Sequence, residues 1–174
     1  MTYKMAVLAM APLLLLTTIF HACDSASRVV KPSVTVIPQG WYLAGQDEYG
    51  YYEEIDGTKW GMVEYIDDSD GDFVQIYYGD VPKELKNRES DPDALKGRAV
   101  LESATFDVDE MFTITISGRL AACAKGYDDT WDTYDMETVF VYESTCIDIY
   151  SCCDATYEDE AQVMSLIESI TFND

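Results

Sequence analysis

Two β-strands joined by a turn are predicted by the stretch Met136-Glu-Thr-Val-Phe-Val-Tyr-Glu-Ser-Thr-Cys-Ile-Asp-Ile-Tyr150. Val139 and Val141 share one face of the first segment, and Ile147 and Ile149 share one face of the second. Alternation of this kind is typical of strands that lie with one face on a core. The residues between the two segments allow the chain to reverse, so we expect an antiparallel hairpin here.

The clearest helix of the sequence follows, over Asp159–Thr171. Thr156 can serve as its N-cap, and acidic residues in the first turn complement the positive end of the helix dipole. Four apolar residues recur at i, i+3, i+4 and i+7 and form one stripe: Val163, Leu166, Ile167 and Ile170. We expect this stripe to cover the apolar face of the hairpin.

The rest of the chain predicts further strands and one more helix. Asp91 and Pro92 suit the N-cap and the first position of a helix in the middle of the chain. Alternating segments predict strands at 34–37, 60–66, 73–78, 112–116 and 120–127. The sequence therefore predicts one α+β domain over residues 33–174, with a central antiparallel β-sheet flanked by helices and a closing C-terminal helix.

The first 22 residues predict an export signal, because Lys4 is followed by an almost unbroken apolar run over residues 5–20. An uncleaved membrane anchor is the alternative, since the run approaches the length needed to span a bilayer. Cys23 follows a small residue and is the predicted lipidation site, with simple cleavage as the competing outcome. Residues 23–32 would then tether the domain, and every outcome places it outside the cytoplasm, anchored to the membrane or secreted.

Negative charge dominates the composition. All 33 acidic residues but only 10 of the 11 basic ones lie from Cys23 onward, which gives that part a formal charge of −23. Such a surface repels nucleic acid and anionic lipid head groups. We therefore exclude nucleic-acid partners and expect contact with a membrane through the N-terminus alone.

Histidine is almost absent, since His21 in the predicted export segment is the single one. Without it no Ser-His-Asp or Cys-His arrangement and no histidine-ligated metal can form. The chain also lacks the glycine-rich motifs that bind phosphates. These features favour a non-enzymatic binding or accessory module without a cofactor, acting on an unknown protein or small ligand.

An acidic run between two predicted strands is a candidate calcium site. It does not fit an EF-hand loop, because Ile66 and Tyr77 stand where that loop needs carboxylates. A looser calcium site is one alternative, and a hairpin turn with solvated carboxylates is the favoured one. The candidate ligands are Asp67, Asp68, Asp70 and Asp72.

A second acidic cluster, which is interleaved with aromatic residues, suggests an alternative function. Paired carboxylates in an aromatic groove are the catalytic arrangement of glycoside hydrolases. The same residues also suit sugar or cation binding, or a solvated loop before a strand. They are Asp128, Asp129, Asp132 and Asp135, with Tyr127, Trp131 and Tyr134.

Four cysteines follow the tether: Cys123, Cys146, Cys152 and Cys153. Outside the cytoplasm we expect disulfides before metal or nucleophile roles. A bridge between the neighbours Cys152 and Cys153 would strain the backbone, and Cys146 and Cys152 lie too far apart on one extended strand. Two arrangements remain: Cys123–Cys152 together with Cys146–Cys153, or a single bridge from Cys123 to the last strand.

The segment Ile37-Pro-Gln-Gly-Trp41 resembles the I-P-x-G-W opening of PsbP-like domains, and the order of predicted elements after it is similar. The resemblance implies an α/β/α sandwich on a central antiparallel sheet. It also implies a binding or accessory role, as in PsbP, an extrinsic subunit that helps retain ions at photosystem II. None of that protein's functional residues can be matched to positions in this chain.

Overall fold

The computed structural model describes residues 28–54, 57–69, 71–103 and 105–173. The predicted export segment and Cys23 lie outside these residues. Within them, nine strands and two helices follow in the order β1 (Pro32–Val34), β2 (Trp41–Glu53), β3 (Lys59–Asp67), β4 (Phe73–Asp80), α1 (Pro92–Glu102), β5 (Glu110–Ile116), β6 (Arg119–Asp128), β7 (Thr133–Tyr142), β8 (Thr145–Asp154), α2 (Tyr157–Glu168) and β9 (Ile170–Phe172).

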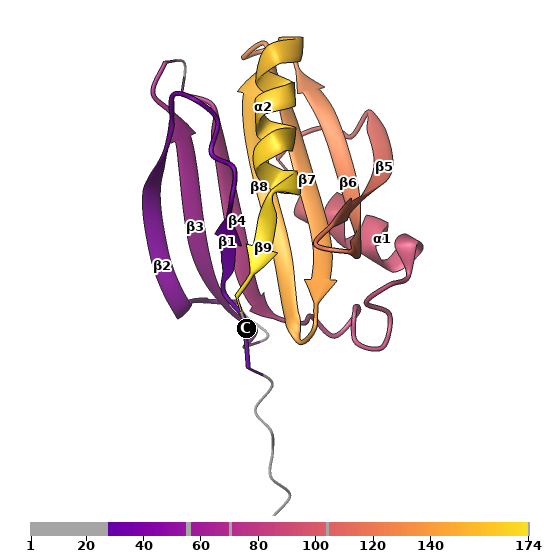
Figure 1. Cartoon of the computed structure of the whole chain (residues 1–174). Coiled ribbons are helices and arrows are strands. Elements are labelled where there is room, and N and C mark those ends of the chain that lie inside the picture. The colour runs from indigo at the N-terminus through magenta and orange to yellow at the C-terminus, as the bar shows by residue number, and fades with distance from the viewer. Residues whose placement is uncertain (1–27, 55–56, 70, 104, 174) are drawn as a thin grey trace, which may run out of the picture.

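Seven of the strands form one antiparallel sheet in the order β2-β3-β4-β8-β7-β6-β5 (Figure 1). Two meanders meet at its centre, where Ile76 of β4 lies opposite Ile149 of β8. The short strands β1 and β9 pair separately, with Ser33 opposite Thr171, and so join the two ends of the described chain.

The two helices lie on opposite faces of the sheet (Figure 1). Helix α2 lies across the larger core, where Val163, Leu166 and Ile167 pack against buried side chains of the central strands. Helix α1 contacts β6 and β7 on the other face, where Leu95 lies in a smaller core. Most of the apolar burial is therefore on the α2 face.

The hairpin predicted from the stretch 136–150 is confirmed as β7 and β8, with Tyr142 opposite Thr145 at the turn. The N-cap of the closing helix is also confirmed, since Thr156 Oγ1 accepts a hydrogen bond from the Asp159 amide at 3.2 Å. The prediction that the helix reaches Thr171 is wrong. Helix α2 ends at Glu168, because the chain from Ile170 onward pairs with β1 instead.

The expected α+β sandwich flanked by helices is wrong. Strands contain 52% of the described residues and helices contain 16%, so the described part of the protein is mostly β. Strand β2 is one reason, because it adds 13 strand residues, most of which lie in a stretch without sequence periodicity. It is an edge strand whose side chains are mostly exposed on both faces, and such a strand needs no alternation of apolar and polar residues.

Neither described helix is long and apolar enough to cross a membrane.

Candidate functional site

A pocket with a volume of about 360 Å³ opens on the α1 face of the sheet. Its lining combines aromatic and charged side chains from both halves of the chain. The lining residues are Tyr52, Glu54, Trp60, Tyr77, Arg98, Glu102, Thr105, Glu137, Asp148 and Tyr150.

Helix α1 carries the central side chain of this pocket, Arg98. Asp91 caps the helix by accepting hydrogen bonds from the amides of residues 93 and 94, and Pro92 occupies the first turn. Leu95 faces the sheet and is fully buried. Arg98 lies one turn further on the same side of the helix and is therefore directed at the sheet, where only 6% of it is exposed.

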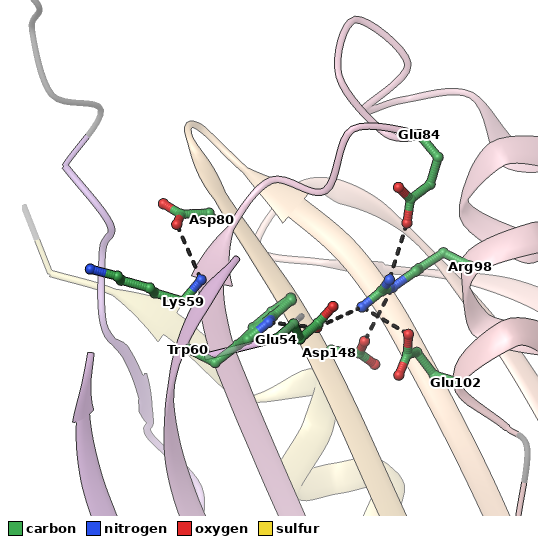
Figure 2. Close-up of polar contacts among 8 residues, drawn as sticks. All are labelled: Glu54, Lys59, Trp60, Asp80, Glu84, Arg98, Glu102 and Asp148. Atoms are coloured by element: carbon green, nitrogen blue, oxygen red, sulfur yellow. Dashed lines mark hydrogen bonds and ion pairs between the residues drawn. The ribbon is translucent and has the colours of Figure 1, made fainter. Parts of the chain in front are cut away.

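Four carboxylates surround the Arg98 guanidinium (Figure 2). Nη1 lies 3.0 Å from Glu84 Oε1, and Nη2 lies 2.8 Å from Glu102 Oε1 and 3.5 Å from Glu54 Oε1. These three carboxylates are at the solvent side and partly exposed. Asp148 lies beneath the guanidinium, with Oδ2 at 3.7 Å from Nε, which is too long for a hydrogen bond.

Trp60 forms an aromatic wall beside Arg98. Its ring centroid is 5.8 Å from the guanidinium carbon, and its Nε1 donates a hydrogen bond of 2.7 Å to Glu54 Oε1 (Figure 2). Gly79 lies opposite Trp60 in the β3–β4 register. A methyl group at Gly79 would stand 2.6 Å from the Trp60 ring, so this glycine makes the space that the ring occupies.

Glu137 and Asp148 form a buried carboxyl pair at the base of the pocket. Glu137 lies opposite Tyr150 and Asp148 opposite Val139, so the two acids are diagonal neighbours on one face of β7 and β8. Burial, followed by the hydrogen bond to Asp148, raises the pKa of Glu137 far above its usual range. Glu137 therefore holds a proton more strongly than a solvent-exposed carboxyl group does, and it can donate this proton to Asp148 in a hydrogen bond.

Burial also raises the pKa of Asp148, while Glu137 and Arg98 act in the opposite direction. Asp148 is 5% exposed, and its Oδ1 receives no hydrogen bond from the described residues unless the protonated Glu137 donates to it. Asp135 lies on the same face of the sheet but outside the pocket lining, and its Oδ1 also has no hydrogen-bond partner among the described residues. Its other oxygen accepts a hydrogen bond of 3.3 Å from Tyr150. The carboxyl pair at the base of the pocket therefore has more acceptor oxygens than donors, because Glu137 supplies the single proton of the pair.

The acidic and aromatic residues predicted as a hydrolase site do not all come together, although the rings of Tyr127 and Tyr134 lie 5.5 Å apart. Asp128 accepts from the Thr130 amide at 2.8 Å, and Asp132 accepts from the Tyr127 hydroxyl at 2.8 Å, both within the β6–β7 turn. Trp131 is 76% exposed in the same turn. Asp135 lies apart from them, buried in β7 beside Tyr150.

The acids predicted as a calcium site lie in the β3–β4 turn, apart from Asp70, which is outside the described residues. Asp67 Oδ1 accepts hydrogen bonds from the amide and hydroxyl of Ser69, both at 2.7 Å. Asp72 Oδ1 accepts from the Asp154 amide at 2.9 Å, and Asp68 is exposed. No three described histidine, cysteine or acidic side chains are arranged to hold one metal ion.

The structure does not bring the disulfide candidates Cys123 and Cys152 together. Cys123 lies opposite Thr138, which lies opposite Ile149, so Cys152 is two strands away and three residues further along. Paired residues share a face of the sheet, and side chains alternate between the two faces along a strand. An offset of three residues therefore puts the Cys123 and Cys152 side chains on opposite faces. The four described cysteines are free thiols, and burial raises the pKa of Cys123 to about 11.

Sequence reasoning missed the residues that line the pocket. Glu137 and Asp148 belong to β7 and β8, the strands that the sequence predicts most clearly. An acidic residue among buried strand residues is unusual, and this pattern could have identified both as candidates. Arg98 gave no signal, because its partners lie up to 50 residues away in the sequence.

No protein-family model matches this chain, and a search of curated proteins finds no match either. The resemblance to PsbP-like domains therefore stays a prediction.

Proposed function

We propose that this protein is an extracytoplasmic, non-enzymatic binding module that holds a small ligand in the pocket between α1 and the sheet. The main support for this proposal is the composition of the pocket. The pocket combines four aromatic side chains with a buried carboxyl pair whose acceptor oxygens are not fully used. A volume of about 360 Å³ lies in the range of small-molecule sites.

The geometry of the carboxyl pair favours binding over glycoside hydrolysis. The hydrogen bond to Asp148 that helps to raise the pKa of Glu137 places the two carboxyl groups in contact. Retaining glycosidases hold their two carboxyls about 5 Å apart, and inverting enzymes hold them further apart. Two carboxyl groups in direct contact leave no room between them for the glycosidic bond that a hydrolase would cleave.

The place of action rests on the N-terminal sequence. The apolar run over residues 5–20 and Cys23 support export and attachment by a lipid. The acidic residues that follow support a soluble surface that stays away from anionic lipid heads. The pocket would then face the exterior on a short tether.

A substitution that fills the pocket tests the proposal. Thr105 is exposed and lines the pocket, so Thr105→Trp should occupy the ligand space without disturbing a core. Thr115→Trp is the matched control, because Thr115 is exposed on the edge strand β5. We expect saturation-transfer NMR against a fragment library to find binders of the wild type and of Thr115→Trp that Thr105→Trp no longer binds.

Two results would count against this function. One is a library without any binder. The other is a set of binders that Thr105→Trp retains as well as the control does, since those molecules would bind elsewhere on the surface.

A further inference from the structure

We infer that the ligand of the α1-face pocket is an organic monocation, a protonated amine whose ammonium group lies against Asp148 and whose carbon skeleton packs on the aromatic walls. This inference rests on the proposed function of the same pocket and specifies the chemistry of its ligand.

The charge around the pocket supports a cation. Four carboxylates and a single guanidinium leave a formal excess of three negative charges, even when Glu137 is counted as neutral. Three of those carboxylates stand at the solvent side, where they attract cations toward the opening. An anionic ligand would have to pass the same groups, and they would repel it.

The hydrogen-bonding groups at the base of the pocket favour a ligand that donates hydrogen bonds. The terminal nitrogens of Arg98 already contact Glu54, Glu84 and Glu102. Asp148 Oδ2 lies 3.7 Å from Arg98 Nε, a distance beyond hydrogen bonding, and Nε itself is unpartnered among the described residues. An ammonium group supplies the N–H donors that a buried carboxylate such as Asp148 needs.

The aromatic walls support an organic cation over a bare metal ion. Tyr52, Trp60 and Tyr77 come from three neighbouring strands, and the rings of Tyr52 and Tyr77 meet edge to face at 6.2 Å. The face of Trp60 already holds one cation, the guanidinium of Arg98. Aromatic faces attract organic cations, whereas a hard metal ion requires converging oxygen ligands.

Three probes that share one ring and differ in charge test the inference. Benzylamine is a cation at about pH 7, benzyl alcohol is its neutral counterpart, and benzoate is an anion. Calorimetric titration of the full chain in a non-ionic detergent should show benzylamine binding about tenfold more tightly than benzyl alcohol. Benzoate should give no binding heat.

Asp148→Asn tests the position of the ammonium group. It should weaken benzylamine binding by about tenfold and change benzyl alcohol binding by less than about twofold. Glu168→Gln is the control, because it removes one exposed negative charge from α2, on the opposite face. We expect this control to bind all three probes as the wild type does.

Equal affinity for benzylamine and benzyl alcohol in the wild type would overturn the inference, whether or not Asp148→Asn folds. Neutral or anionic fragments that bind the wild type but not Thr105→Trp would also overturn the inference that the ligand is a cation. They would still support the proposal that the pocket binds a small ligand. Absence of any binder sensitive to Thr105→Trp would sink both proposals.

Discussion

Glu137 lies where its charged form is unstable, and this makes the stability of the fold depend on pH. Its pKa is raised in the folded protein above its value in the unfolded chain, chiefly by burial. Between those two values the folded state holds a proton that the unfolded state has released. The free energy of unfolding must therefore fall as pH rises through this range, by about 1.4 kcal/mol per pH unit for one proton.

Glu137→Gln should remove this dependence, because the amide keeps the shape of the protonated carboxyl and cannot ionise. We expect its free energy of unfolding to rise relative to the wild type by up to about 1.4 kcal/mol per pH unit above about pH 5. Urea unfolding at a series of pH values up to about 8 measures this difference. Glu168→Gln should keep the wild-type slope, and a constant offset for Glu137→Gln would show that residue 137 is ionised in the fold.

Strand β4 and helix α1 each contain a glycine whose surroundings predict opposite effects of the same substitution. Gly79 of β4 has no space for a methyl group, which would meet the Lys59 carbonyl at 2.2 Å and the Trp60 ring. Gly97 of α1 is exposed, and a methyl group there meets nothing within 4 Å. The first glycine is needed for packing, and the second only weakens its helix.

Gly79→Ala should therefore destabilise the protein by about 2 kcal/mol or more and displace Trp60 from the pocket wall. Gly97→Ala should stabilise it by about 0.5–1 kcal/mol. Denaturant midpoints measure both effects, and near-ultraviolet circular dichroism reports the movement of the tryptophan. A Gly79→Ala variant as stable as the wild type would mean that β3 and β4 are not paired in this register.

The elements that the sequence predicted well are those with strong periodicity and local contacts. The β7–β8 hairpin and α2 are continuous in sequence, and their apolar side chains repeat with the period of the structure that they form. The prediction failed where periodicity was missing, as in the exposed edge strand β2. It also failed at the end of α2, where pairing with β1, more than 130 residues away, overrides the helical pattern.

The pocket could not be predicted in the same way, because strand register and helix placement assemble it. Glu54, Arg98 and Asp148 come from three distant parts of the chain and meet only after β4 pairs with β8. Clusters of acidic residues in the sequence did not identify the pocket. The acids of the β6–β7 turn are close in sequence, yet hydrogen bonds within that turn hold Asp128 and Asp132.

At the scale of the whole molecule, the net charge should affect the stability of the fold. A formal charge of −23 from Cys23 onward should destabilise the compact state through self-repulsion when little salt is present. The Debye length falls from about 30 Å at 0.01 M to about 3 Å at 1 M salt, so added salt should remove most of this repulsion. We expect the melting temperature of the full chain in a non-ionic detergent to rise steadily with sodium chloride.

Calcium chloride at matched ionic strength separates general screening from a specific site in the β3–β4 turn. Asp67 and Asp72 already accept hydrogen bonds from protein amides, so binding a calcium ion would require them to give up those partners. We therefore expect both salts to raise the melting temperature equally. An additional rise of several degrees with millimolar calcium, lost in Asp68→Asn, would instead assign this turn as a calcium site. Asp68 is the suitable position for that variant because its side chain is exposed.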